Sequence, residues 1–146
     1  MKKTQILFLC TGNSIRSQIA EGYLRRFGGN SIEAWSAGVS PSGIHRLTIQ
    51  VLEEDGIDIS DHRSKPIDEI PLDCIDYVIT LCNNAKDRCP SLPAHIQTEH
   101  WPIDDPVNFI GSEDKKVNRF RRTRDEIRGR VLEFLKQSKI KLGQVV

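Results

Sequence analysis

Short apolar runs alternate along the chain with segments whose apolar residues recur every three or four positions. The runs predict four buried strands, at Gln5–Leu9, Ile32–Ala37, Tyr77–Leu81 and Ile96–Trp101. The helical spacing predicts helices at Ser17–Phe27, Leu47–Glu54, Ile67–Ile70 and, as a long final helix, about Ser112–Lys139. This alternation favours an α/β fold: a single three-layer domain with a four-stranded parallel sheet and helices on both faces. Residues 139–146 show no pattern and are predicted to be a disordered tail.

The composition is that of an ordinary globular protein, and it limits the classes of partner that we expect. The chain has 146 residues, 38% of them hydrophobic, which is enough for one self-sufficient core. Its net charge is +1. Six arginines between residues 119 and 130 are interrupted by Asp125 and Glu126, so they indicate a solvated helix face and no nucleic-acid partner. The apolar run after the N-terminus is too short for a signal peptide or membrane span. We therefore expect a cytoplasmic monomer with no membrane partner.

The most informative segment follows the first predicted strand, where five residues separate Cys10 from Arg16. Gly12, Asn13 and Ser14 lie between strand and helix, and such residues let successive backbone N–H groups point inward toward an anion. The helix N-terminus adds partial positive charge, and a guanidinium can bind two oxygens of one oxyanion. The same field favours a nucleophilic thiolate at Cys10. The predicted oxyanion-binding loop is Thr11, Gly12, Asn13, Ser14, Ile15, Arg16 and Ser17.

An alternative interpretation makes Cys10 a small apolar residue at a strand end and Arg16 a surface charge. Buried, inert cysteines are common, and for an arbitrary cysteine this would be the favoured interpretation. The turn residues between the strand and the helix reverse the preference, because they place the thiol and the guanidinium on one loop.

Two further cysteines follow the Tyr77–Leu81 strand. Cys82 comes directly after it, and Cys89 lies beyond six polar-rich residues that we expect to be exposed and able to rearrange. Parallel strands end at one edge of the sheet, so Cys82 should lie near Cys10. Three thiols in series could pass oxidation from one to the next, because a thiolate attacks a sulfur-bound group. For either cysteine alone, inert packing is the alternative.

Zinc is another alternative for this pair, since His95 and His100 lie downstream. The six-residue interval is wider than the two to four residues usual in structural zinc sites, so no zinc is expected. Cys74 stands before the Tyr77–Leu81 strand with no neighbour that suggests chemistry, and we interpret it as structural.

A third candidate element follows the last predicted strand. Asp105 lies on a loop there and could reach over an oxyanion to protonate a leaving oxygen as a general acid. Asp before Pro also commonly starts a turn, which is the alternative for Asp105-Pro106 alone. Its place after a strand, in a chain with the cysteine–arginine loop, favours the catalytic interpretation. Asp104 is expected at most to tune its neighbour.

These residues resemble the thioredoxin-coupled arsenate reductases, from about residue 5 to residue 137. The resemblance implies the fold of the low-molecular-weight protein tyrosine phosphatases, with which the first loop and the Asp-Pro are shared. Cys82 and Cys89 distinguish the reductases, as does Gln18 where phosphatases usually carry proline. The matching segments are Cys10–Gln18, Trp35–Gly38, Gly56–Ser60, Val78–Cys82, Cys89–Pro90 and His100–Pro106.

The resemblance implies a redox relay with no bound cofactor and with electrons from thioredoxin. Cys10 would attack arsenate held by the loop amides and Arg16, and Asp105 would assist departure of water or hydroxide. Cys82 would then attack the adduct and release arsenite, leaving a Cys10–Cys82 disulfide. Cys89 would convert it to a Cys82–Cys89 disulfide that thioredoxin reduces. By the same resemblance Ser17 hydrogen-bonds the nucleophilic sulfur and Asn13 fixes the loop.

Two positions depart from the family pattern. Many relatives have a further cysteine where this chain has Ile15, and its loss should leave the relay intact. Some relatives bind potassium near the loop, and Asn13, Glu21 and Ser36 match that site, but Lys65 occupies the fourth position. An ammonium group there would compete with a cation and could pair with Glu21, so we expect no metal.

Two other functions compete with arsenate reduction. A low-molecular-weight protein tyrosine phosphatase would need only Cys10, Arg16, Ser17 and Asp105. An anion-binding or redox-sensing module would bind phosphate or sulfate and form disulfides without turnover. A glutathione and glutaredoxin supply of electrons is disfavoured by the presence of Cys89.

Overall fold

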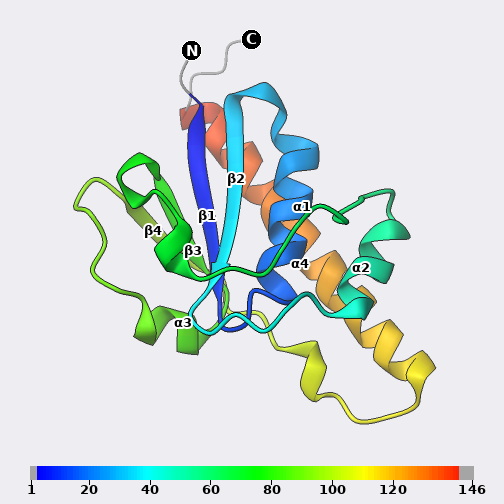
Figure 1. The fold of residues 1–146 in the computed structure, drawn as a ribbon. Helices are drawn as coiled ribbons and strands as arrows, with labels where there is room; N and C mark the ends of the chain where they lie inside the picture. The colour runs from blue at the N-terminus through cyan, green and yellow to red at the C-terminus, as the bar shows by residue number, and fades with distance from the viewer. Residues whose placement is uncertain (1–2, 142–146) are drawn as a thin grey trace.

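Four parallel strands form the centre of the computed structural model, which describes residues 3–141 (Figure 1). They are β1 (Thr4–Cys10), β2 (Ile32–Gly38), β3 (Tyr77–Thr80) and β4 (Gln97–His100), in the order β2-β1-β3-β4. The register pairs Cys10 with Gly38 and Thr80 with His100. All four strands therefore end at the same edge of the sheet, which is the lower edge in Figure 1.

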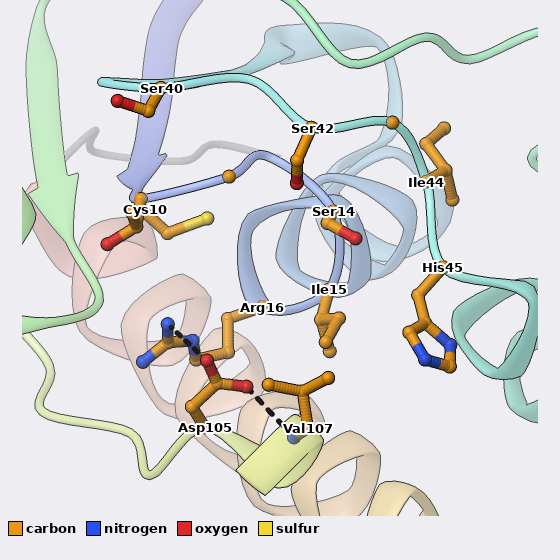
Figure 2. A pocket seen from close by; sticks show the side chains of 13 residues that line it. Cys10, Ser14, Ile15, Arg16, Ser40, Ser42, Ile44, His45, Asp105 and Val107 are labelled. Atoms are coloured by element: carbon orange, nitrogen blue, oxygen red, sulfur yellow. Dashed lines mark hydrogen bonds and ion pairs between the residues drawn. The ribbon is translucent and has the colours of Figure 1, made fainter.

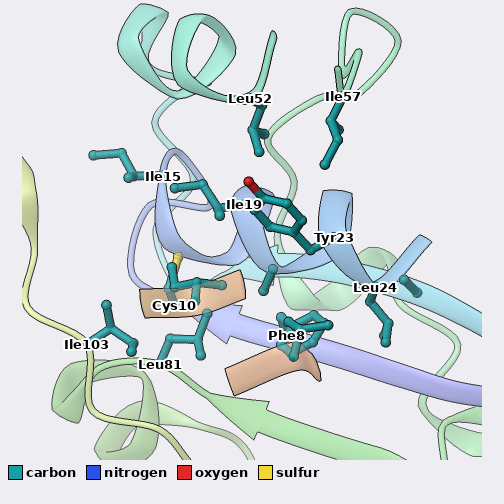
Figure 3. Packing of buried hydrophobic residues seen from close by; sticks show 14 of the residues in the cluster. Phe8, Cys10, Ile15, Ile19, Tyr23, Leu24, Leu52, Ile57, Leu81 and Ile103 are labelled. Carbon is teal, nitrogen blue, oxygen red and sulfur yellow. The ribbon is translucent and has the colours of Figure 1, made fainter. Parts of the chain in front are cut away.

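One face of the sheet is covered by three helices, α1 (Arg16–Gly28), α2 (Arg46–Glu53) and α4 (Glu113–Lys141). Helix α1 packs on β1 and β2, and α4 and α2 pack on α1. Phe8 of β1 and Tyr23 of α1 are fully buried in this layer (Figure 3). The apolar stripe of α4 completes it with Phe120, Ile127, Val131 and Phe134.

The opposite face has a thinner cover. Leu7, Leu9 and Val78 point to this side because side chains alternate along a strand, and they form a second buried cluster. Two short 3-10 turns (Ile67–Glu69 and Leu72–Cys74) and the short helix α3 (Asn83–Arg88) pack on it. Only Ala85 of α3 is buried in this cluster, so α3 lies on the sheet with one small side chain inward.

Arginines of the basic run on α4 form ion pairs with acidic residues at the end of α2. Arg121 and Arg124 both bind the carboxylate of Glu54 at the end of α2, at 2.7 and 2.9 Å. Arg128 binds Asp55 at 2.9 Å, and Asp55 also accepts a hydrogen bond from Tyr23 at 2.6 Å. The arginines therefore form ion pairs along a helix face.

The fold class and all four strands are confirmed, with boundaries shifted by at most one residue at each end. The expected Ile67–Ile70 helix is a 3-10 turn, Ile67–Glu69. Helix α4 continues to Lys141, two residues beyond its expected end at about Lys139; residues 142–146 of the predicted disordered tail lie outside the described residues. No helix in the described part is long and apolar enough to cross a membrane.

Candidate active site

The loop between β1 and α1 is held from outside through its carbonyl oxygens. The backbone N–H groups of Val39, Ser40, Ser42 and His45 donate to the carbonyls of Cys10, Thr11, Gly12 and Ser14, at 2.8 to 3.2 Å. The carbonyl of Asn13 accepts from the Gln18 side chain at 3.3 Å. Because N–H and C=O of a trans peptide point in opposite directions, this arrangement turns the loop N–H groups toward the interior of the loop.

The interior opens into a cavity of about 480 Å³. The predicted loop supplies much of its wall, and Figure 2 shows the Cys10 sulfur pointing into the space above Arg16. Arg16 is 8% exposed and donates to the carbonyl of Ile103 at 2.9 Å and to Asp105 at 3.4 Å. These two bonds fix the guanidinium while leaving most of its five donors for an anion. The cavity is lined by Cys10, Thr11, Gly12, Ser14, Ile15, Arg16, Ser40, Ser42, Gly43, Ile44, His45, Asp105 and Val107.

Behind the loop, a short hydrogen-bond chain leads to the Cys10 sulfur. Asn13 is fully buried and donates from its amide nitrogen to the Ser17 hydroxyl oxygen at 2.7 Å. Ser17 lies 2.9 Å from the Cys10 sulfur. Since the Ser17 oxygen already accepts from Asn13, its own proton is free to be donated to the sulfur. A hydrogen bond donated by this hydroxyl stabilises the thiolate form that nucleophilic chemistry needs.

Two residues give the loop its backbone path. Asn13 has a φ of 49°, in the left-handed region that asparagine tolerates better than most residues. Gly38, at the end of β2, lies against the loop: a Cβ there would stand 2.7 Å from the Thr11 carbonyl oxygen and 2.8 Å from the Asn13 nitrogen. Glycine is therefore required at this close approach between β2 and the loop.

Asp105 lies at the mouth of the cavity, beside Arg16 and Val107 (Figure 2). One carboxylate oxygen faces the Arg16 guanidinium and the other accepts from the Val107 N–H at 3.0 Å. The side chain is 29% exposed, so it can exchange protons with water. Asp104 is 95% exposed and lies 3.9 Å from Arg119, which places it away from the cavity lining.

Cys82 caps helix α3 immediately beside the loop. Its sulfur accepts from the Ala85 N–H at 3.4 Å and lies 3.3 Å from the Thr11 hydroxyl. The Asn84 amide donates to the same hydroxyl at 3.0 Å. The contact of Cys82 with the loop therefore runs through Thr11, the residue next to Cys10.

Cys82 does not itself line the cavity, and neither do the other two cysteines. Cys89 ends α3, is half-buried, and lines a separate groove of about 440 Å³ over β3 and β4. Burial raises the pKa of the Cys89 thiol. Cys74, interpreted from the sequence as structural, is exposed and does not belong to the buried core. His95 binds the carbonyl of Ile75 and His100 binds Thr80 and Asn83; within residues 3–141 no three His, Cys, Asp or Glu side chains converge as metal ligands.

The residues matched to a potassium site have their oxygens engaged by the protein. The side-chain oxygen Oδ1 of Asn13 accepts from the Lys65 N–H at 2.9 Å and from the Gln18 side chain at 3.1 Å. Glu21, 3% exposed, binds Arg25 at 2.7 Å and accepts a hydrogen bond from Ser36. The suggested pairing of Lys65 with Glu21 is not seen: the ammonium lies 3.5 Å from the carbonyl of Arg63. The arrangement does not fit a cation at this position.

Sequence reasoning missed the outer support of the loop. Ser64 donates to the Gly12 carbonyl at 2.8 Å, Thr48 to the Ser14 carbonyl at 3.0 Å, and Gln18 bridges Asn13 to the carbonyl of Arg63. Small hydroxyl residues in loops are too common to signal such a role. Only Gln18 carried a signal, as a departure from the phosphatase pattern.

The fold and this site define a class of α/β proteins that hold a tetrahedral oxyanion against a cysteine on a strand-to-helix loop. Residues 5–143 match the family model of the low molecular weight phosphotyrosine protein phosphatases. An arsenate reductase of Bacillus subtilis is 43% identical over 139 residues, 95% of this chain and 100% of that protein. The chain belongs to this family, in the branch that includes such arsenate reductases.

Solved structures agree on the fold. A thioredoxin-dependent arsenate reductase of Corynebacterium glutamicum matches with a TM-score of 0.77 at 33% identity, over 98% of this chain and 64% of that one. An arginine phosphatase of Geobacillus stearothermophilus matches with a TM-score of 0.80 at 25% identity, over 98% of both chains. The same fold thus serves a reductase and a phosphatase, and the residues around the loop must separate the two activities.

Proposed function

We propose that this protein reduces arsenate to arsenite through Cys10, Cys82 and Cys89, and that thioredoxin reduces the resulting disulfide. The observation that carries the proposal is the second thiol at the edge of the anion loop: Cys82 lies 3.3 Å from the Thr11 hydroxyl. Hydrolysis of a phosphate monoester by Cys10, Arg16, Ser17 and Asp105 requires no thiol at that position. Arsenate fits the loop because it shares the charge and tetrahedral shape of phosphate.

In the first step the Cys10 thiolate attacks the arsenic atom and a sulfur–arsenic bond forms. Arg16 and the loop N–H groups hold the remaining oxygens, and Ser17 stabilises the thiolate before attack. An oxygen departs as water once it has received a proton, and Asp105 at the mouth of the cavity is placed to deliver it.

The next steps move two electrons to arsenic. Cys82 attacks the Cys10 sulfur, a Cys10–Cys82 disulfide forms, and the electron pair of the broken sulfur–arsenic bond leaves with arsenic as arsenite. Cys89 then attacks Cys82, frees the Cys10 thiolate and leaves a Cys82–Cys89 disulfide. Two thiols of thioredoxin reduce that disulfide in the same manner. All three cysteines belong to one chain, consistent with a monomer, and the reducing cytoplasm would supply the thioredoxin.

The last internal step requires helix α3 to unwind. Cys82 and Cys89 are the two caps of the six-residue helix α3, and the seven residue steps between them separate their Cα atoms by about 10 Å at 1.5 Å per step. A disulfide requires Cα atoms within about 7 Å of each other. The helix that holds Cys82 in the reduced protein must therefore open when Cys89 attacks.

The test is arsenate-dependent oxidation of NADPH in the presence of thioredoxin and thioredoxin reductase. The parent should turn over only when thioredoxin is present, and Cys10→Ser, Cys82→Ser and Cys89→Ser should each abolish cycling. Cys74→Ser is the matched control and should cycle normally. Normal cycling by Cys89→Ser would overturn the relay.

Phosphate-monoester hydrolysis is the second candidate, because the family and the Cys10, Arg16, Ser17 and Asp105 set are shared with phosphatases. Cys82→Ser separates the two activities: it should keep any hydrolysis of an aryl phosphate while losing arsenate reduction. Hydrolysis by the parent without arsenate turnover would assign the chain to the phosphatases.

A further inference from the structure

His100 joins the end of the sheet to the first turn of α3. Its Nδ1 lies 2.7 Å from the Thr80 hydroxyl, and its Nε2 lies 3.1 Å from the Asn83 carbonyl oxygen. Because an amide oxygen only accepts, His100 donates from Nε2 and accepts from the Thr80 hydroxyl at Nδ1. One imidazole ring thus links β3, β4 and α3.

Contacts within the sheet hold Thr80 and His100 in place independently of the link to Asn83. Thr80 and His100 are directly paired at the ends of β3 and β4, and the backbone N–H of Trp101 donates to the Thr80 carbonyl at 2.8 Å. Asn83 is exposed and stands next to Cys82. His100 is therefore a rigid anchor, and Asn83 is the point at which the helix is held to it.

His100 and the third cysteine of the relay also line one groove. His100 and Thr80 line the groove over β3 and β4 into which Cys89 is packed. A six-residue helix with one buried side chain is marginal by itself, so its stability depends on ties such as those of Asn83 to His100 and of Asn84 to Thr11.

We propose that His100 is a positioning residue that fastens the first turn of α3 while the protein is reduced and releases it when Cys89 moves to Cys82. This role depends on the thiol relay proposed above. Fastened, α3 keeps the Cys82 sulfur beside Thr11; released, α3 can unwind and bring the two caps together.

The first test needs no arsenate. The amide of Lys86 donates to the Cys82 carbonyl at 3.1 Å within α3, so its hydrogen exchange in the reduced protein reports opening of the helix. His100→Ala and Asn83→Ala should each speed this exchange about three- to tenfold, the effect of losing one net hydrogen bond. The double variant should be no faster than the singles, because both remove the same link.

His95→Ala is the matched control. It loses a histidine hydrogen bond of 2.8 Å to the carbonyl of Ile75 at the other end of β4, without a link to α3. It should leave Lys86 exchange unchanged. If His100→Ala disturbs the sheet, Asn83→Ala still tests the link from the exposed side. Unchanged exchange in Asn83→Ala would overturn the proposal, as would equal acceleration in His95→Ala.

A second test measures the reaction in a Cys89→Ser background, where one turnover stops at the Cys10–Cys82 disulfide. Adding His100→Ala should slow formation of this disulfide severalfold, and His100→Gln, which can still donate to Asn83, should restore part of the rate. Equal rates in all three would overturn a role in positioning Cys82. If the Cys89→Ser parent forms no disulfide with arsenate, the proposed function fails, and the exchange comparison decides the role of His100 separately.

Discussion

The Ser17 hydroxyl is held so that it can donate a hydrogen bond to the Cys10 sulfur. It accepts from Asn13 and lies 2.9 Å from the Cys10 sulfur, so its proton is directed at sulfur by the bond that its oxygen already makes. Asn13 in turn is fixed by Gln18 and by the Lys65 N–H. The nucleophile is therefore supported by buried residues that do not line the cavity.

Ser17→Ala should slow the reaction of Cys10 at least tenfold. Hydrogen bonds to a charged group contribute about 1.5–3 kcal/mol, and the substitution also leaves the buried Asn13 amide without its acceptor. The measurement is the rate of Cys10 alkylation by iodoacetamide at pH 7 in a Cys74→Ser background, with peptide mass spectrometry to separate the sites. An unchanged rate would mean that Ser17 does not stabilise the thiolate.

The sequence predicted the residues of the oxyanion-binding loop because they are close together in the chain. Cysteine, the turn residues, Arg16 and Ser17 are consecutive, so their mutual placement depends mostly on local backbone geometry. The outer support, in contrast, comes from Ser64, Thr48 and the backbone after β2. These contacts join residues more than twenty positions apart, and no local pattern encodes them.

The end of strand β2 packs directly against the oxyanion-binding loop. Gly38→Ala would push a Cβ into the loop backbone, whose atoms would lie at 2.7 and 2.8 Å. Overpacking of this kind costs about 1–3 kcal/mol, and here the loop itself must move. We expect a lower melting temperature and at least tenfold weaker phosphate binding, both measurable by thermal unfolding at increasing phosphate concentration.

Gly129→Ala provides the control for Gly38→Ala. Gly129 lies within α4, and a Cβ there meets nothing within 4 Å. Alanine is the better helix former by about 1 kcal/mol, so this variant should be as stable as the parent or more stable, with phosphate binding unchanged. Equal effects of the two substitutions would show that the close approach at Gly38 is not what shapes the loop.

Helix α3 was the one helix that no pattern predicted. Its residues are almost all polar and exposed, with Ala85 alone buried, so there is no apolar stripe to detect. Its N-cap is a cysteine, which is not among the usual capping residues. The helix exists because of tertiary ties to Thr11 and His100, and a local reading of the sequence therefore recovers Cys82 and Cys89 but not the element between them.

The whole molecule places most of its core on one side. Helical periodicity in α1 and α4, an apolar run in β1 and a β-branched run in β3 made the sheet and its thicker layer predictable. The thinner layer is built from 3-10 turns, loops and α3, whose positions depend on the sheet already being formed. This asymmetry leaves the redox segment on the side where least apolar surface holds it.

Acid should weaken the folded state partly through His62. The ring is buried, donates from Nδ1 to the Gln18 side-chain oxygen at 3.0 Å, and has its Nε2 3.8 Å from Glu21. Burial, reinforced by Arg25 and Lys65, lowers the pKa of His62 from its ordinary 6.5, although Glu21 opposes the shift. The unfolded chain therefore binds a proton at a higher pH than the folded protein does.

The sign of the pH dependence follows from that difference. The stabilisation is fully present above pH 6.5 and is lost as the pH falls through the lower, folded-state pKa, at a rate of at most about 1.4 kcal/mol per pH unit. His62→Gln keeps a donor toward Gln18 but cannot titrate, so its free energy of unfolding should fall less steeply between pH 7 and pH 5. Urea unfolding at several pH values measures both slopes; parallel curves for parent and variant would show that His62 does not carry this part of the acid sensitivity.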